Sequence, residues 1–372
     1  MKLVIERAAL LKSLAHVQSV VERRNTIPIL ANLLMEAGDG ALKLTATDMD
    51  LAIVESVAAE TPQSGATTAP AHTLYDIVRK LPEGAQVELA ADGDRSQLAL
   101  RAGRSSFNLA CLPTEDFPVT DGAEFPTEFQ LAAEELRGLI DRTRFAVSTE
   151  ETRYYLNGIY FHEAENDGGK SLRAVATDGH RLARVEMPLP AGGEGMPSII
   201  VPRKAVSELR KLIDETTDPV AVSLSDTRAR FAFDSAVLTT KLIDGTFPDY
   251  ERVIPAGNDK VLEVDRRTFA EAVDRVSTIS TEKSRSVKLA ISEGALVLSA
   301  TSPDSGSATE ELEVSYQSDD LEIGFNSSYL LDIARQIEGD AVRFVMADAS
   351  SPTLVQDLAD ASALFVLMPM RV

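Results

Sequence analysis

Two polar residues near the middle of the chain are of the types that acid–base catalysis uses. Asp178 and His180 lie two positions apart in the segment ATDGHRL, residues 176–182. A carboxylate that orients an imidazole could serve acyl transfer if a matched nucleophile were present. The sequence contains no Gly-x-Ser-x-Gly elbow, and the pair lies where an alternating strand pattern runs into a turn. We therefore predict that the pair is not catalytic and that the protein is not an enzyme.

Phosphate and metal chemistry have equally weak support. Gly169-Lys170-Ser171 resembles the end of a phosphate-binding loop, but the first glycine of such a loop would fall at Ala164, and a strand pattern follows where a helix should begin. Cys111 is the single cysteine, which excludes an internal disulfide, and no Cys/His cluster has metal-ligand spacing. We expect no metal and no cofactor.

Arginines on predicted helices are the next candidates, because guanidinium groups bind phosphates. The net charge of −21 argues against nucleic acid. Six predicted helices together carry +1, however, so the strands and loops hold the acidic excess. If the helices shared one face, that face would repel DNA far less, with Arg137, Arg203 and Arg210 among its cations. Alternatively, these arginines lie on solvated helix surfaces with i,i+4 partners.

Two other segments are ambiguous from their residues alone. Arg23 and Arg24 lie in a loop between a helix and a strand, and they either reach a polyanion or are ordinary loop cations. The C-terminal segment ALFVLMPMRV, residues 363–372, is apolar where chain ends are usually polar. It is predicted to be either the last buried strand or one wall of an apolar groove, for which flexible methionines are well suited.

A threefold repeat has to position these groups. Apolar residues alternate along 42–46, 172–176 and 296–300, and each run follows a glycine turn and an earlier apolar stretch. Each copy therefore predicts a β-hairpin. The copies lie 130 and 124 residues apart, which makes the repeat the size of a domain and excludes a solenoid of short repeats.

Helical patterns recur in the same register as the hairpins. Apolar residues three or four apart predict helices at 6–22, 71–83, 132–147, 202–214, 265–277 and 327–338. Three domains follow, at 1–124, 125–256 and 257–372, with joints in the loops 120–127 and 255–259. No apolar run approaches a membrane span and no signal peptide is evident, so a cytoplasmic protein without a membrane partner is expected.

Six motifs, in order along the whole chain, resemble those of the bacterial DNA polymerase sliding clamps, the beta subunits of the replicative polymerase. They are IPILANL (27–33), TRYYLNG (152–158), ATDGHRL (176–182), DGTFPDY (244–250), GFNSSY (324–329) and MPMR (368–371). The resemblance implies an α+β fold of three tandem DNA-clamp domains, each with two β-α-β-β-β units. It also implies a head-to-tail dimeric ring, with helices lining the hole and sheets outside.

The same resemblance implies the function and the partners. A closed ring would hold double-stranded DNA of any sequence by topology and would tether the polymerase, raising its effective concentration at the primer end. The implied partners are DNA, a second copy of the chain, the polymerase catalytic subunit, the clamp loader and other proteins with a clamp-binding motif.

Site residues are also implied by the resemblance. A pocket between the second and third domains would take a short peptide with Gln, Leu and Phe-type anchors. Its matching residues are Arg153, Leu156, Thr177, Gly179, His180, Arg181, Leu182, Pro248, Arg252, Val253, Asn326, Tyr329, Val366, Met368, Pro369, Met370 and Arg371. Family DNA contacts match Arg24, Tyr154 and Tyr155. At the dimer seam, Phe107 and Leu109 of one chain would face Thr278 and Ile279 of the other.

The chain also departs from the family pattern. Related clamps often have two aliphatic residues where this chain has Thr278 and Ile279, which predicts a seam weaker by about 1–2 kcal/mol. Glu251 puts acid where a neutral or basic residue would suit DNA. Two other classes stay open: a binding scaffold that never encircles DNA, and an enzyme, which would need a catalytic cluster.

Overall fold

The protein is described by a computed structural model for residues 1–92, 96–118, 124–166, 168–280 and 285–371. The predicted joint at 120–127 lies partly outside these residues. The described chain is α+β, with 25 strands and six α-helices. Within these ranges, no helix is both long and apolar enough to cross a membrane.

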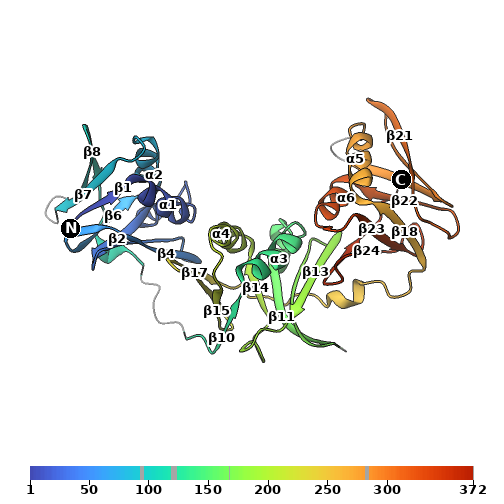
Figure 1. Ribbon diagram of the computed structural model, residues 1–372, viewed down its shortest axis with the longest axis horizontal. Helices are drawn as coiled ribbons and strands as arrows, with labels where there is room; N and C mark the ends of the chain where they lie inside the picture. The colour runs from blue at the N-terminus through green and yellow to red at the C-terminus, as the bar shows by residue number, and fades with distance from the viewer. Residues whose placement is uncertain (93–95, 119–123, 167, 281–284, 372) are drawn as a thin grey trace. The chain divides into compact units, whose positions relative to one another are not determined.

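Contacts within the chain divide it into two compact units, whose elements are labelled in Figure 1. Unit 1 comprises Met1–Arg137, Pro190–Pro197 and Lys204–Leu242. Unit 2 comprises Gly138–Leu189, Ser198–Arg203 and Ile243–Val372. Both units contain part of the middle third of the chain, so the predicted domain limits at 124 and 256 stay a prediction.

Unit 1 contains two antiparallel sheets. The five-stranded sheet consists, in spatial order, of Glu60–Gln63 (β5), Lys2–Glu6 (β1), Gln86–Asp92 (β7), Gln97–Ala102 (β8) and Ser105–Ala110 (β9). The eight-stranded sheet consists, in spatial order, of Thr127–Leu131 (β10), Val220–Leu224 (β15), Arg228–Ala232 (β16), Ala236–Lys241 (β17), Leu51–Ala58 (β4), Ala41–Thr47 (β3), Asn32–Gly38 (β2) and Gly65–Pro70 (β6).

Unit 2 also contains two antiparallel sheets. Its eight-stranded sheet consists, in spatial order, of Ile199–Pro202 (β14), Gly158–Asn166 (β11), Gly169–Thr177 (β12), Arg181–Pro188 (β13), Ala363–Leu367 (β25), Thr353–Asp357 (β24), Ala341–Met346 (β23) and Lys260–Asp265 (β18). Its four-stranded sheet consists of Gly306–Glu313 (β21), Ala295–Ser302 (β20), Ser286–Ser292 (β19) and Leu321–Asn326 (β22).

The six predicted helices are confirmed, each within its predicted range. They are Arg7–Gln18 (α1), Ala71–Lys80 (α2), Ala133–Arg144 (α3), Arg203–Ile213 (α4), Arg266–Ser277 (α5) and Ser327–Ala334 (α6). Short 3₁₀ helices cover Pro28–Ala31 (η1), Thr114–Asp116 (η2), Glu151–Leu156 (η3) and Tyr250–Val253 (η4). Helix α2 ends early because Leu81 precedes a proline and is extended, with ψ 154°.

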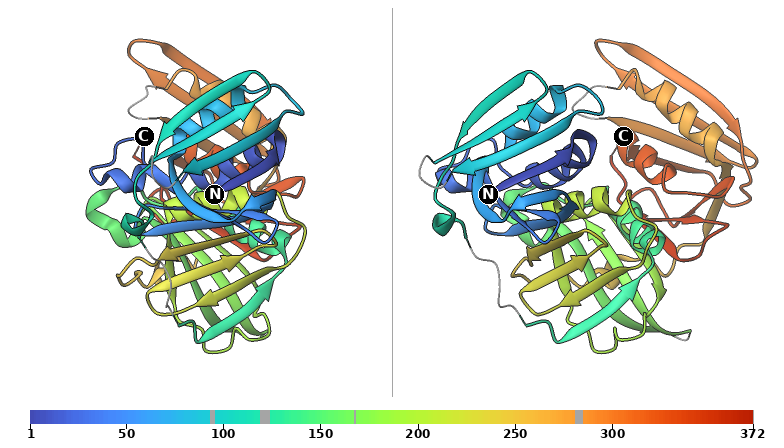
Figure 2. Two further views of the ribbon diagram at one scale, coloured as in Figure 1. Left: turned by 90° about the vertical axis from the view of Figure 1, so that its left-hand side faces the viewer. Right: turned by 60° about the vertical axis from the view of Figure 1, so that its left-hand side comes forward.

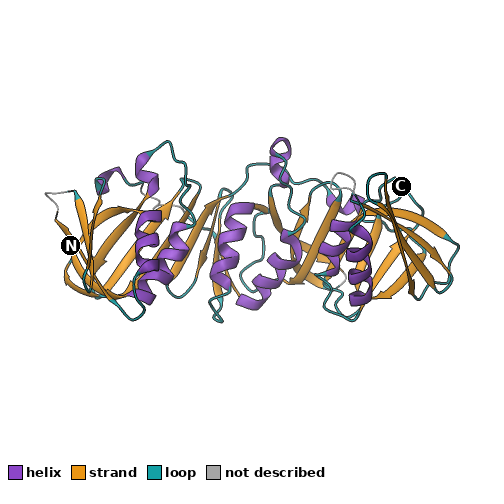
Figure 3. Ribbon diagram, turned by 90° about the horizontal axis from the view of Figure 1, so that it is seen from above, coloured by secondary structure: helices purple, strands orange, loops and turns teal. Residues whose placement is uncertain are grey.

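Helices pair and pack on the sheets within each unit. In unit 1, α1 lies beside α2 and packs on β3 and β4, with Leu10, Leu14 and Val17 buried. In unit 2, α5 lies beside α6 and packs across the hairpin of β20 and β21, which is orange in Figure 2. Figure 3 shows these helix pairs in purple against the strands of their own units.

The three predicted hairpins are confirmed as β2–β3, β11–β12 and β19–β20. After β3 and after β12 the chain makes a second turn, and the two turns have the same hydrogen bonds. The hydroxyl of Thr47 donates to the carbonyl of Leu51 at 2.9 Å, and Thr177 makes the same bond, at 2.7 Å, to the residue four positions on. The aspartate after each threonine accepts from backbone N–H groups two and three residues on, at 2.7 to 3.0 Å. The repeated Thr-Asp pair therefore builds a turn.

A charged cluster joins first-third and middle-third residues inside unit 1. His16 of α1 is buried, and its Nδ1 lies 2.6 Å from Glu55 of β4. Its Nε2 lies 2.8 Å from Glu215, which follows α4. Burial disfavours a charged imidazole, but the hydrogen bonds to Glu55 and Glu215 outweigh it and raise the pKa of His16. Both ring nitrogens therefore donate to carboxylates.

We predict that His16→Gln destabilises the protein most at pH 6, by about 2 kcal/mol, because the charge-assisted bonds are lost. Since the folded pKa of His16 lies above its ordinary 6.5, the contribution of His16 is complete below about pH 6.5 and falls as pH rises through the folded value. Thermal unfolding followed by circular dichroism from pH 6 to 9 checks this, with exposed His180→Gln as control. A stability difference that stays constant over this range would contradict it.

Candidate functional site

A pocket of about 260 Å³ lies within unit 2 and is bounded mostly by apolar side chains. Four segments form it: η3, the turn between β12 and β13, the connector (residues 243–256) that carries η4, and the C-terminal strand β25 with the residue after it. The lining residues are Arg153, Tyr155, Leu156, Thr177, Gly179, His180, Arg181, Leu182, Pro248, Asp249, Tyr250, Val253, Val366 and Met368.

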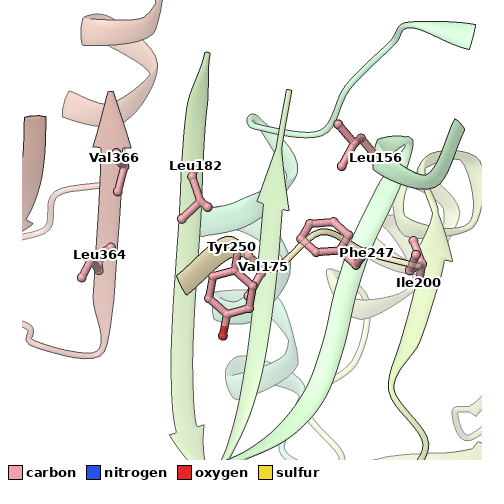
Figure 4. Close-up of a cluster of buried hydrophobic side chains, with 8 residues drawn as sticks. All are labelled: Leu156, Val175, Leu182, Ile200, Phe247, Tyr250, Leu364 and Val366. Atoms are coloured by element: carbon pink, nitrogen blue, oxygen red, sulfur yellow. The ribbon is translucent and has the colours of Figure 1, made fainter. Parts of the chain in front are cut away.

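A cluster of buried hydrophobic side chains supports this pocket (Figure 4). Its members are Leu156, Val175, Leu182, Ile200, Phe247, Tyr250, Leu364 and Val366. Figure 4 shows Phe247 and Tyr250, from the connector, lying across the strands of the sheet. Leu156, Leu182 and Val366 both belong to the core and line the pocket, so a structural role and a pocket position coincide for them.

Gly179 and Arg153 meet at one side of the pocket. Gly179 has φ +88°, and a Cβ added to it would lie 2.5 Å from Nη1 of Arg153. The backbone conformation favours glycine, whereas the end of the flexible Arg153 side chain could move away from an added Cβ. Nε of Arg153 donates to Glu150 at 2.8 Å, and this bond raises the pKa of Arg153 and lowers the pKa of Glu150.

Arg181 connects the turn to the helices around it. Its Nη1 donates to Asp332 of α6 at 2.6 Å, and its Nη2 donates to the carbonyl of Phe145 at 2.6 Å. Its Nε pairs with Asp178 at 3.1 Å, and its guanidinium carbon lies 4.3 Å from the ring centroid of Tyr329. Because only 11% of the side chain is exposed, most of its hydrogen-bonding capacity serves the fold. Asp178 likewise serves the turn, because its carboxylate accepts from two backbone N–H groups and pairs with Arg181.

The C-terminal residues continue past β25 as a paired segment. The backbone N–H of Met368 donates to the carbonyl of His180 at 2.8 Å, and that of Met370 donates to the carbonyl of Gly324 at 2.8 Å. β25 itself is buried throughout, whereas Met368 is 37% exposed at the pocket. Both predicted roles of the tail therefore occur: a buried strand and then a groove wall.

Six residues predicted for the pocket do not line it in the described structure: Arg252, Asn326, Tyr329, Pro369, Met370 and Arg371. Arg252 is largely exposed and pairs with Asp249 at 2.6 Å. The Asn326 side chain accepts from Ser328 N and caps α6. Tyr329 stacks against His180 with ring centroids 6.4 Å apart, and burial raises its pKa. Tyr329 therefore contacts the pocket residues His180 and Arg181, whereas Asn326 stabilises the start of α6.

Sequence reasoning missed three lining residues. Asp249 and Tyr250 end the motif DGTFPDY, and the aromatic character of that motif was the available signal. Tyr155 was predicted as a DNA contact but is half-buried and lines the pocket. Its neighbour Tyr154 is 52% exposed, with its ring edge-on to Tyr155.

The predicted arginine contacts lie in different surroundings. Arg24 is exposed in the loop before η1, and Arg203 is exposed at the start of α4. Arg210 forms an i,i+4 ion pair with Asp214, which supports the solvated-helix alternative for that side chain. Arg137 lies 3.6 Å from the same carboxylate and donates to the carbonyl of Ile213 at 3.2 Å.

The predicted seam residues lie on an edge strand and at the end of a helix. Phe107 and Leu109 belong to β9, an edge strand of the five-stranded sheet in unit 1. Thr278 caps α5 of unit 2 and is exposed, and Ile279 after it is half-buried.

The other chemical candidates have structural roles. Gly169-Lys170-Ser171 opens strand β12, and Lys170 pairs with Glu163 across the hairpin at 2.6 Å, so the phosphate-loop interpretation is wrong, as predicted. Among the described residues, no group of three or more His, Cys, Asp or Glu side chains is placed to hold a metal ion.

Comparison with known proteins gives one consistent result. Three family models match in order: the DNA polymerase III beta subunit N-terminal domain over residues 1–121, its central domain over 130–249 and its C-terminal domain over 251–371. The beta sliding clamp of Caulobacter vibrioides (strain NA1000 / CB15N) is 54% identical over 372 residues, and that of Escherichia coli (strain K12) is 42% identical over 374 residues. Both alignments cover all of both chains.

A solved structure is similarly close. A DnaN sliding clamp (DNA polymerase III subunit beta) from Bartonella birtlesii, bound to griselimycin, superposes with a TM-score of 0.97 at 52% identity. The superposition covers all of both chains.

We predict that Arg181→Met lowers the free energy of unfolding by at least about 3 kcal/mol, because it leaves carboxylates and a carbonyl without their buried cation. Arg335→Met is the matched control, since Arg335 pairs with the same Asp332 but is 71% exposed. Its expected cost is under about 1 kcal/mol. Urea unfolding followed by circular dichroism measures both, because the chain has no tryptophan. Equal losses in the two variants would rule out the structural role of Arg181.

Proposed function

This chain belongs to the DNA polymerase III beta subunit family, and from that premise we propose that two copies close into a ring that encircles duplex DNA and tethers a polymerase to it. The observation that carries the proposal is the tandem match of three clamp domains along the whole chain. In this role the protein breaks no bond and acts only by holding its partners together.

Two edge strands support a head-to-tail ring. β9 of unit 1 and β21 of unit 2 each end a sheet, so each presents a row of backbone groups that a strand of a second copy can pair with. β21 carries Glu311 and Glu313, as well as Glu310, which already pairs with Arg275 of α5 at 2.6 Å. Arg101 lies in β8, and Arg104 lies in the turn before β9. Opposite charges on the two edges favour joining β9 of one copy to β21 of the next. Phe107, Leu109, Thr278 and Ile279 are the proposed seam residues.

The proposed DNA contacts are weak and independent of sequence. Arg24 and Arg203, both exposed, are proposed to contact phosphates, and exposed Tyr154 to stack on an unpaired base. Arg137 and Arg210 share Asp214, which reduces their attraction for phosphate without abolishing it. Such contacts guide the duplex while permitting sliding.

The proposed partner site is the pocket in unit 2. A mostly apolar wall with a few polar groups suits a short peptide with hydrophobic anchors and one amide side chain. Because a relative has been solved bound to griselimycin, we propose that griselimycin also binds this chain and competes with such a peptide. Domain limits near residues 124 and 256 complete the proposal.

The test is retention on DNA after loading, with a high-salt wash. We predict that the protein stays on circular DNA and is lost from the same DNA once linearised, because salt removes electrostatic contacts but cannot open a closed ring. Quantitative immunoblotting of bound protein on the two templates measures this. Equal loss from both would favour the scaffold alternative, and turnover of any DNA bond would favour an enzyme.

We predict that deletion of residues 368–372 abolishes binding of a fluorescent peptide with glutamine, leucine and phenylalanine anchors while leaving the dimer intact. The deletion removes the Met368 wall, but β25 ends at Leu367, so all eight strands of its sheet remain. Fluorescence anisotropy measures the peptide, and analytical sedimentation measures the dimer. Unchanged peptide affinity would exclude the tail from the site.

A further inference from the structure

Arg173 lies in the middle of β12, beneath the connector, and only 8% of its side chain is exposed. Its Nε donates to Glu186 of β13 at 2.7 Å. Its Nη1 donates to Glu251 at 2.6 Å and to the hydroxyl of Tyr250 at 3.3 Å. Burial opposes the charge, yet the hydrogen bonds with Tyr250 and Glu186 raise the pKa of Arg173, which keeps it a fixed cation.

His162 of β11 faces the same hydroxyl. Its Nδ1 lies 2.8 Å from the carbonyl oxygen of Glu163, and its Nε2 lies 3.0 Å from the Tyr250 hydroxyl. A carbonyl only accepts, so in the neutral ring Nδ1 carries the proton and Nε2 is an acceptor. Burial lowers the pKa of His162, which favours this neutral form. The Tyr250 hydroxyl therefore donates to His162 and accepts from Arg173.

Tyr250 is the point where this network meets the pocket. It is 5% exposed, it begins η4, and it lines the pocket together with Pro248 and Val253. Three residues earlier, Phe247 stacks on Tyr160 with ring centroids 4.7 Å apart and planes 6° apart. A backbone hydrogen bond from the N–H of Ile243 to the carbonyl of Ile200, together with these side-chain contacts, holds the connector against the sheet.

We propose that Arg173 and His162 are positioning residues for peptide recognition: they lock the Tyr250 hydroxyl from beneath and so hold the connector wall in its binding shape. The inference rests on the proposed function, because it assigns the support of that same pocket. Neither residue is among those that line the pocket in the described structure. They act through Tyr250 and do not contact the ligand.

The network also gives Glu251 a role. Its side chain is 61% exposed, and its carboxylate is bound to the buried guanidinium of Arg173. An acidic residue at this position therefore belongs to the support of the pocket wall. Its cost to DNA binding is reduced only in part, because Glu251 shares the single positive charge of Arg173 with Glu186.

Tyr250→Phe and His162→Phe test the inference, with the fluorescent peptide of glutamine, leucine and phenylalanine anchors as probe. Each variant should raise the peptide Kd roughly tenfold, because each leaves a buried hydrogen-bonding group without its partner. The double variant should lose no more than either single one, since both break one network. His162→Phe keeps an aromatic ring beside Tyr160 and lies outside the pocket lining, so its loss cannot come from a lost ligand contact.

Tyr316→Phe is the matched control. Tyr316 is 2% exposed in the same unit, and its hydroxyl donates to the carbonyl of Asp319 at 2.6 Å, away from the pocket-lining residues. It should lower the thermal midpoint while leaving the peptide Kd within about twofold of wild type. A ¹⁵N spectrum of the four histidines adds a direct readout. The unprotonated Nε2 resonance of His162 should shift in Tyr250→Phe and stay in place in Tyr316→Phe.

The outcomes separate the inference from the function it rests on. Wild-type protein that fails to bind the peptide at all would refute the proposed pocket. Normal binding by wild type together with unchanged binding by Tyr250→Phe and His162→Phe would overturn the positioning role alone. Losses that simply multiply in the double variant, or an equal loss in Tyr316→Phe, would also overturn it.

Discussion

Edge-to-edge pairing of strands from successive thirds of the chain is the constraint on which the rest of the structure depends. β17 pairs with β4 in unit 1, and β25 pairs with β13 in unit 2. Backbone donors and acceptors of a buried strand must be satisfied, so neither pair can separate without exposing a row of them. Each pairing therefore makes one continuous eight-stranded sheet from strands of two thirds of the chain. Each also places a Thr-Asp turn beside the end of a strand that comes from far along the chain.

The two strand pairings, β17 with β4 and β25 with β13, lie beside turns of the same geometry but differ in the side chains around them. Where β17 pairs with β4, a cavity of only about 30 Å³ lies between the Thr47 turn and β17. Lys241 pairs with Asp50 at this cavity, at 2.9 Å. Where β25 pairs with β13, Val366 of β25 and the following Met368 line the larger pocket, and the connector adds Tyr250. The turn motif is thus a structural device used twice. A binding pocket requires apolar residues on the opposing strand and a connector to complete the wall.

Local patterns predicted most of the fold because helices and hairpins depend on residues close in sequence. The six helices, the three repeated hairpins and the family resemblance are confirmed. Contacts between distant residues were beyond reach. No periodicity indicates that Arg173 lies beneath Tyr250, or that His16 bridges carboxylates 39 and 199 residues away. The acid at Glu251, unexplained by the sequence, has its reason in such a contact.

The pocket prediction shows the same limit from another side. Family motifs indicated the residues of the turn and the tail, but they did not separate lining residues from supporting ones. The family resemblance predicted Asn326 and Tyr329 as pocket residues. In this structure Asn326 caps α6, and Tyr329 stacks on His180. Whether a side chain lines the pocket or caps a helix depends on contacts between distant residues, which sequence spacing does not encode.

In the proposed ring, the charge pattern favours sliding along DNA. Each phosphate that a protein neutralises adds roughly one unit to the salt dependence of binding, so a lining of unpaired arginines would grip the duplex and slow movement along it. In this chain Asp214 forms ion pairs with both Arg137 and Arg210, which reduces the attraction of both arginines for phosphate. A net charge of −21 weakens attraction to DNA further. In the proposed ring, retention must then come from closure of the seam. In the same proposal, tight binding of partners belongs to the pocket, where apolar walls act at short range and do not contact the DNA.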